Sequence, residues 1–201
     1  MKKEKKEVDG KIVDFLFETG MLAKTPRSGF FFLGSGEQSV AEHTNRVCYI
    51  GFALASMSNG ADSAKILEMC LFHDLAEARV SDLNYVHQKY NNRDEQSAIK
   101  DLTLGLPFGD KIYNILHEYE EKDSYESKLA KDADNLEFIL SLKEQIDIGN
   151  ERAISWIEVA IKRLKTKEAQ SLIKTIIKTD SDRWWFGDKK DHWWVDRIKN
   201  N

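Results

Sequence analysis

His73 and Asp74 are neighbouring residues whose side chains could bind a metal ion. They interrupt an apolar stretch, residues 71–77, where an unpaired carboxylate would cost several kcal/mol. Two further candidate ligands are His43, which precedes this pair, and Asp134, which follows it. Two imidazoles and two carboxylates make a nitrogen-and-oxygen site with room left for water. This combination indicates hydrolysis assisted by a divalent metal ion.

Each of these residues also has a purely structural interpretation. A single buried histidine such as His43 is commonly a hydrogen-bonded core residue, and Asp134 could be a carboxylate on a helix surface. Asp74 could instead form a salt bridge with Arg27 or Arg79. We favour the metal interpretation because one cation compensates an aspartate and a histidine at the same time.

Helices are expected to position these side chains. The chain has two prolines and long segments in which apolar residues recur every three or four positions, which predicts an all-α fold. Ser39 and Glu42 match a capping box at the start of one helix. His43 therefore falls in the first turn of that helix, on the face that is buried.

A second helix is expected to begin after Asp62, which can cap it. Its pattern continues through His73 to Glu77, so these two side chains lie on one stripe, one turn apart. Asp74 lies at the edge of the same face. Residues 79–84 then form a turn out of the helix.

The remaining helices are expected near residues 93–102, 112–119, 125–146, 152–164 and 168–178. Asp134 lies in the middle of the longest of them. His87 is expected in a polar loop and His117 off the apolar stripe of its helix. A second metal site built on these two histidines is therefore not favoured.

Composition restricts the possible partners and location. The net charge of −4 provides no global basic field, so binding to a nucleic acid polymer is not favoured. The lysine-rich start lacks the apolar segment of a signal peptide, and no stretch approaches the roughly 18 apolar residues of a membrane span. The two cysteines do not indicate a disulfide framework, so we expect a cytoplasmic protein with no membrane partner.

We expect one domain over residues 1–201, with a core at about 10–180 and an aromatic tail at 181–201. The tail holds four of the five tryptophans, and each such ring can bury about 150–250 Å². The simplest interpretation is that the tail covers its own domain or a dimer partner. A role in stacking on a substrate is the alternative.

Three segments together resemble the HD-domain metal-dependent phosphohydrolases, and within them the bacterial 5′-deoxynucleotidase and HD-domain-containing protein 2 group. They are Ser39-Val40-Ala41-Glu42-His43, Phe72-His73-Asp74-Leu75-Ala76-Glu77 and Lys131-Asp132-Ala133-Asp134-Asn135-Leu136-Glu137. The resemblance covers about residues 10–180. It implies an HD-domain helical bundle with a metal site between helices, and a homodimer.

The resemblance implies that His43, His73, Asp74 and Asp134 bind one divalent transition metal. Asp132 is the fallback for the last of these ligands. Mn, Co, Fe, Ni or Zn suits two imidazoles and two carboxylates, whereas Mg is less natural with two imidazoles.

The same resemblance assigns three further roles. Glu77 matches the catalytic glutamate, Arg27 matches an arginine that binds the phosphate, and Asp82 matches an acidic residue that contacts the sugar. Related deoxynucleotidases have a tryptophan near this arginine, whereas this chain has Ser28, Gly29 and Phe30.

The loop over residues 25–36 is rich in glycine and aromatic residues. The three phenylalanines at 30–32 could form a wall on which a base stacks. They could equally form a hydrophobic plug that ties the loop to the core.

The expected activity is therefore release of phosphate from (deoxy)nucleoside 5′-monophosphates, a small-molecule nucleotide substrate. One alternative is a phosphodiesterase or nucleoside-triphosphate hydrolase of the same fold. The other is a non-catalytic, metal-bound scaffold that senses nucleotides. Glu77 separates the last alternative from an enzyme, because a structural metal site has no use for a free carboxylate beside it.

Overall fold

The computed structural model describes residues 2–187 and 190–197, and the elements in this part of the chain are all helical. The first half contains α1 (Lys2–Thr19), η1 (Gly20–Ala23), α2 (Phe30–Leu33), α3 (Val40–Met57), α4 (Ser63–Phe72), α5 (Glu77–Val80) and α6 (Tyr85–Tyr90). The second half contains α7 (Glu95–Thr103), α8 (Gly109–Glu121), α9 (Tyr125–Asp147), α10 (Arg152–Ala160), η2 (Ile161–Arg163), α11 (Lys167–Ile176), α12 (Arg183–Phe186) and α13 (His192–Val195). The all-α prediction is confirmed.

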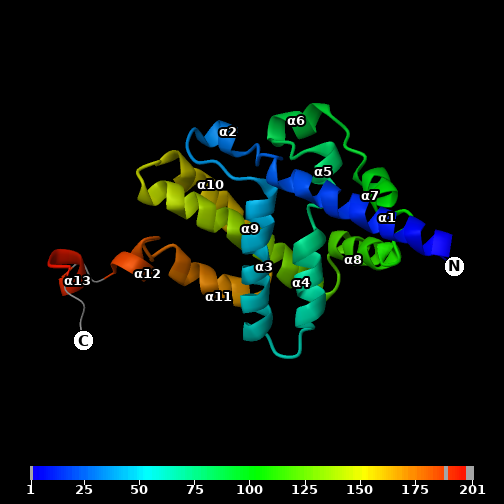
Figure 1. Ribbon diagram of the computed structural model, residues 1–201. Coiled ribbons are helices and arrows are strands. Elements are labelled where there is room, and N and C mark those ends of the chain that lie inside the picture. Colours follow the sequence, from blue (N-terminus) through cyan, green and yellow to red (C-terminus); the bar gives the residue numbers. More distant parts are fainter. Residues whose placement is uncertain (1, 188–189, 198–201) are drawn as a thin grey trace.

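The long helix α9 lies at the centre of the bundle and packs against α3, α4, α8, α10 and α11 (Figure 1). The main core contains fully buried side chains from three of these helices, among them Val47, Leu54, Ile66, Leu136 and Ile139. A second apolar cluster lies beneath α1, α7 and α8. Their burial holds α3, α4 and α9 together, and the candidate ligands lie on α3, on α9 and in the turn after α4.

Two helix starts follow the predicted chemistry. At α3 the Ser39 side chain accepts a hydrogen bond from the Glu42 backbone N–H, and the Glu42 carboxylate accepts one from the Ser39 N–H at 2.6 Å. At α4 the Asp62 side chain accepts a hydrogen bond from the Lys65 N–H. The capping box fixes where α3 begins and so places His43 in its first turn.

The prediction that one helix runs through His73 to Glu77 is wrong. Helix α4 ends at Phe72, and the next four residues form a turn before α5 begins. The backbone N–H groups of Leu75 and Glu77 each bond three residues back, to the carbonyls of Phe72 and Asp74. This tighter 3₁₀-like winding replaces the α-helix at the residues that face the other candidate ligands.

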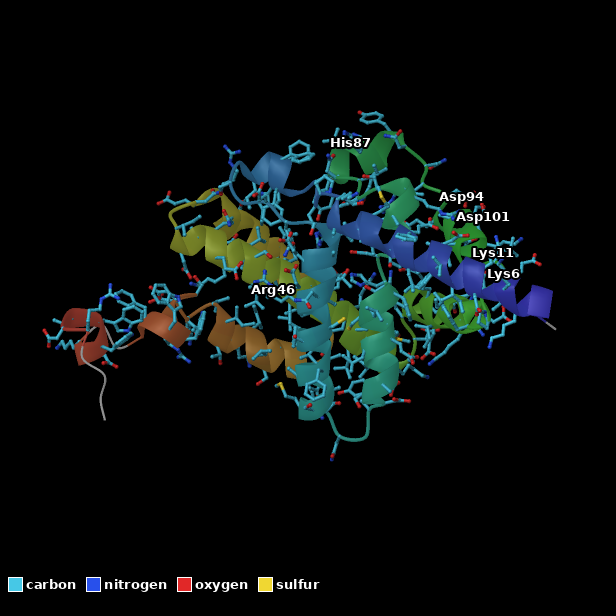
Figure 2. The ribbon with its side chains drawn as sticks, in the orientation of Figure 1. Lys6, Lys11, Arg46, His87, Asp94 and Asp101 are labelled. Carbon is cyan, nitrogen blue, oxygen red and sulfur yellow. The ribbon has the colours of Figure 1, made fainter. Side chains whose placement is uncertain are left out.

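Two shorter segments also differ from expectation. The aromatic loop contains the single-turn helix α2, and His87 lies on α6 instead of in a loop. Figure 2 labels His87 on this helix. The Asn84 side chain caps α6 by accepting hydrogen bonds from the N–H groups of Val86 and His87.

The described part of the aromatic tail lies at the far end of the molecule from α1 (Figure 1). Trp185, Phe186 and Trp194 contact one another, with ring centroids 5.3–5.5 Å apart. Trp184 is 86% exposed. Residues 188–189 and 198–201 of the predicted tail lie outside the described residues. The described tail thus packs largely on itself and leaves much aromatic surface open.

No helix in the described part of the chain combines the length and the apolar character of a membrane span. The assignment of residues 1–201 to one domain stays a prediction.

Candidate metal centre and its pocket

The structure brings the four predicted ligands together from α3, α9 and the turn after α4. The His43 Nε2 atom lies 3.2 Å from His73 Nε2, 3.3 Å from Asp134 Oδ1 and 3.5 Å from Asp74 Oδ2. The His73 Nε2 atom is also 3.2 Å from Asp74 Oδ2. Both imidazoles are buried, whereas the two carboxylates are partly open to solvent.

The other nitrogen of each imidazole is already engaged. His43 Nδ1 lies 2.5 Å from Glu137 Oε2, and His73 Nδ1 lies 2.9 Å from the Cys70 carbonyl oxygen. Because a carbonyl can only accept, His73 Nδ1 must carry the proton of that bond. The same tautomer at His43 directs both Nε2 lone pairs into the space between the carboxylates.

The charges around this space favour a cation. Burial opposes protonation of His43, but hydrogen bonds to Asp134 and Glu137 outweigh it and raise the pKa of His43 to about 9. Burial also opposes ionisation of Asp74 and Asp134, yet the two histidines hold the pKa of each carboxyl well below its usual range. A proton on His43 therefore offsets part of the negative charge of Asp74 and Asp134. A divalent ion in the same place would offset more of that charge.

The donor set thus fits a divalent metal. His43, His73 and Asp134 offer ligand atoms that all lie within 4.8 Å of one another, and among the described residues no other such group of three is found. Asp74 adds a fourth ligand atom, an oxygen 3.2 Å from His73 Nε2 and 3.5 Å from His43 Nε2. Nitrogen and carboxylate oxygen together suit a borderline transition metal.

Asp132, the fallback ligand, faces away from this centre. Its carboxylate accepts hydrogen bonds from the backbone N–H groups of Lys165 and Thr166 and from the Thr166 hydroxyl, at 2.7–3.0 Å. It is 1% exposed and ties α9 to the start of α11. The structure therefore favours Asp134 over Asp132 as the ligand.

Arg27 lies beside the centre. Its Nη1 atom is 3.3 Å from Asp74 Oδ2, and its Nε atom is 3.7 Å from Asp82 Oδ2. Asp82 also accepts a hydrogen bond from the Ser28 backbone N–H at 3.1 Å. The salt bridge between Arg27 and Asp74, considered as an alternative to a metal, exists alongside the ligand cluster.

Glu77 lies in the same pocket as Arg27 and Asp74, and it is buried. Arg93 donates a long hydrogen bond of 3.4 Å to Glu77 Oε1, whereas the buried Oε2 atom has no hydrogen-bond partner. Burial, together with the charges of Asp74 and Asp82, raises the pKa of Glu77 to about 9. A carboxyl with a spare oxygen and a raised pKa can hold a proton near neutral pH.

Glu137 is the main residue that sequence reasoning missed. Besides His43, it accepts hydrogen bonds from Gln38, Arg46 and Ser141 at 2.7–3.0 Å. Burial opposes its ionisation, but His43 and Arg46 lower the pKa of Glu137 to about 2. Figure 2 labels Arg46 on α3, and its contacts show that it bridges this helix to α9. A glutamate three residues after Asp134, on a buried face, is the signal that could have found it.

The other candidate residues lie elsewhere. Arg79 pairs with Glu18 and Asp101, His87 contacts Asn84, and His117 is exposed beside Glu121.

The pocket beside the centre has a volume of about 310 Å³, within the range of small-molecule sites. Its charged lining residues include Arg27, Asp74, Glu77, Asp82 and Asp134. Four aromatic side chains also line it: Phe30, Tyr85, Phe138 and Trp156.

Comparison with known proteins places the chain in a family. The family model described as HD domain matches residues 19–176. The chain is 31% identical over 139 residues to a 5′-deoxynucleotidase HDDC2 of Danio rerio, covering 66% of this chain and 68% of the relative. It is 30% identical over 145 residues to the protein of the same name from Dictyostelium discoideum, covering 66% of this chain and 76% of the relative.

A solved structure has a similar fold. A conserved hypothetical protein from Pyrococcus furiosus superposes with a TM-score of 0.71 at 30% identity, covering 83% of this chain and 97% of that protein. Together with the matched model, these findings show that the chain belongs to the HD domain family.

Proposed function

We propose that this protein is a metal-dependent phosphomonoesterase that releases phosphate from (deoxy)nucleoside 5′-monophosphates. The observation that carries the proposal is the convergence of two imidazoles and two carboxylates beside an arginine and a buried glutamate in one pocket. The names of the two curated relatives, both 5′-deoxynucleotidases, support the choice of substrate class.

His43, His73, Asp74 and Asp134 are the proposed ligands of one divalent ion. When bound, such an ion supplies Lewis-acid chemistry, because it polarises a phosphate oxygen and lowers the pKa of a water molecule. Glu137 and the Cys70 carbonyl fix the tautomers of the two histidines, so that both Nε2 atoms remain available as ligands. Mn, Co, Fe, Ni and Zn are the proposed metals, with Mg less suited to two imidazoles.

Arg27 is the proposed phosphate-binding residue. Its guanidinium lies between Asp74 and Asp82 and is partly exposed in the pocket. Two N–H groups of one guanidinium can bind two phosphate oxygens and offset the charge that develops as the P–O bond breaks.

Glu77 is the proposed catalytic acid and base. Its Oε2 atom, which has no partner, takes a proton from the attacking water while the water oxygen bonds to phosphorus. The same carboxyl then returns a proton to the leaving 5′ oxygen, so that the products are a nucleoside and inorganic phosphate. A positive charge nearby would lower the pKa of Glu77 and ready it to accept the first proton.

Asp82 is the proposed sugar contact. One of its oxygens accepts the Ser28 N–H, and the carboxylate lines the pocket next to Arg27. A ribose hydroxyl could donate to this carboxylate.

We also propose that the protein is a cytoplasmic homodimer. Tyr49 and Phe52 on α3 are more than half exposed, and Leu71 on α4 is 50% exposed beside the same apolar groove. An apolar face of this kind is typical of protein–protein contacts. Both cysteines are free thiols, which suits a reducing compartment. Light scattering tests the dimer.

A screen of phosphate release tests the activity. Metal-stripped protein is supplied with Mn, Co or Mg in turn and offered nucleoside mono-, di- and triphosphates. We expect inorganic phosphate from a deoxynucleoside 5′-monophosphate. Release of pyrophosphate or triphosphate instead would contradict the proposal and favour a nucleoside-triphosphate hydrolase.

The variant Glu77→Ala separates an enzyme from a scaffold. We expect turnover to be lost while metal content and melting temperature stay nearly unchanged, because Glu77 lies outside the ligand cluster. Parallel loss of the fold would support the scaffold interpretation.

A further inference from the structure

The pocket extends beyond the ligands along one face of α9. Asp134, Phe138 and Leu142 all line it and follow one another at four-residue steps. Since an α-helix rises about 1.5 Å per residue, Phe138 lies about 6 Å and Leu142 about 12 Å further along the helix axis than Asp134. The aromatic side chain of Phe138 therefore lies one helical turn from the carboxylate that faces the two histidines.

Two other helices complete this aromatic surface. Trp156 on α10 lies against Phe138, with ring centroids 6.4 Å apart and planes tilted by 42°. Phe30 on α2 lines the same pocket. All three side chains are half-buried, because one side of each packs against the main core while the pocket remains beside them.

Several polar side chains that line the pocket are engaged with the protein itself. The Asn135 Nδ2 donates to the Lys131 carbonyl, and the Arg163 Nη2 donates to the Tyr85 hydroxyl at 2.6 Å. Gln88 likewise donates to a backbone carbonyl. For a bound ligand, the pocket therefore offers aromatic surface for stacking more than free polar groups for hydrogen bonding.

We propose that Phe30, Phe138 and Trp156 form a nucleobase subsite, which holds the base of the substrate by stacking while Arg27 holds the phosphate. This inference rests on the proposed nucleotidase function. Every nucleobase presents an aromatic face, and stacking on a protein ring contributes to binding without reading the base edges. The subsite explains why aromatic residues from three helices line a pocket that also contains Arg27 and four carboxylates.

The test compares two substrates that differ only in the base. Deoxyadenosine 5′-monophosphate and 2-deoxyribose 5-phosphate share the phosphate and the sugar. We expect kcat/KM of the wild-type protein to be about tenfold or more higher for the nucleotide, since stacking contributes about this much. Trp156→Leu should reduce the nucleotide value towards that of the sugar phosphate and leave the sugar phosphate value unchanged.

Matched variants control for general effects. Trp184→Leu removes an indole from the exposed tail, and Phe31→Leu removes a ring that is 66% exposed beside Phe30. Both should behave as wild type, whereas Phe30→Leu should repeat the effect of Trp156→Leu. Equal loss on both substrates in the pocket variants, or no preference for the nucleotide in the wild-type protein, would overturn the subsite.

A binding measurement keeps this test separate from the test of catalysis. Calorimetric titration with deoxyadenosine, which has no phosphate to hydrolyse, should show binding to wild type and weakening by about tenfold in Trp156→Leu. Equal binding to both proteins, or none to wild type, would overturn the subsite. Binding that depends on Trp156 in a protein without phosphatase activity would overturn the proposed function and leave the subsite supported.

Discussion

Asp132 and Asp134 lie two residues apart on α9, and their surroundings differ in kind. Asp132 accepts hydrogen bonds from two backbone N–H groups and a hydroxyl, which complete its shell. Asp134 instead lies 3.3 Å from the Nε2 atom of His43, which is also 3.5 Å from Asp74. Successive residues on an α-helix are about 100° apart, so the two carboxylates point to nearly opposite sides.

The surroundings of these two aspartates indicate the role of each one. A carboxylate surrounded by N–H donors is satisfied by the protein and stabilises the fold. A carboxylate that faces imidazole nitrogens has its negative charge only partly compensated, and a metal ion can supply the missing positive charge.

The largest effect is expected for Asp134→Asn. An amide is a weaker ligand for a transition metal, so metal affinity should fall by more than the roughly 10–100-fold that loss of an outer-shell partner costs. Phosphate release should fall with it, and the metal-free variant should melt below metal-free wild type, because ionised Asp134 pairs with His43 in the metal-free fold. Elemental analysis, a phosphate assay and calorimetry check these results, and retention of one metal per chain would contradict them.

Glu137→Gln probes the shell behind the ligands. The neutral amide holds the His43 Nδ1–H less strongly and no longer compensates Arg46, so metal affinity should fall by about 10–100-fold. Glu144→Gln is the matched control, because Glu144 also pairs with Arg46 but its side chain is 46% exposed. Competition with a chelator measures both affinities; equal affinities in the two variants would refute the positioning role.

Asp132→Asn should act on stability alone. The amide group turns at least one N–H donor toward the donors at the start of α11. This should lower the free energy of unfolding by about 1–3 kcal/mol. For a domain of this size that corresponds to a fall in melting temperature of roughly 3–10 °C. The folded variant should still bind one metal ion. Loss of metal without loss of stability would reverse the assignments of the two aspartates.

The smallest effect concerns Glu77, a buried acid whose Oε2 atom has no hydrogen-bond partner. Its pKa in the metal-free fold, about 9, lies above the ordinary value of 4.5. The stability linked to its proton is therefore complete below pH 4.5 and is lost as the pH rises towards 9. The side chain in Glu77→Gln does not ionise, so this variant does not lose that stability as the pH rises.

The melting temperature of metal-free Glu77→Gln should therefore rise relative to that of metal-free wild type as the pH increases. Melting temperatures measured at about pH 5 and about pH 8 provide the check, because the difference between variant and wild type should widen by a few degrees. A difference that stays constant over this range would show that Glu77 is ionised throughout.

Much of this arrangement could be predicted from the sequence. The capping box at Ser39 and the apolar periodicity locate α3, and the order of histidines and aspartates resembles a known metal-binding pattern. Local hydrogen bonds and periodicity act over a few residues, so they can be read from the chain directly. The four predicted ligands accordingly converge in the structure.

The turn at His73–Ala76 could not be read in this way. Its residues continue a helical pattern, and only contacts with α3 and α9 distinguish a tighter winding from an α-helix. The partners of Asp132 and Glu137 are likewise distant in sequence, since they come from residues 165–166 and from Gln38, His43 and Arg46. Tertiary packing therefore decides which hydrogen-bond donors reach each carboxylate.

Anomalous X-ray diffraction from crystals soaked in Mn²⁺ tests the central claim most directly. We expect one strong peak within about 2.0–2.3 Å of His43 Nε2, His73 Nε2, Asp74 and Asp134, and no peak at Asp132. A peak that omits these atoms, or imidazoles and carboxylates that remain bridged to Arg27 around an empty centre, would contradict it.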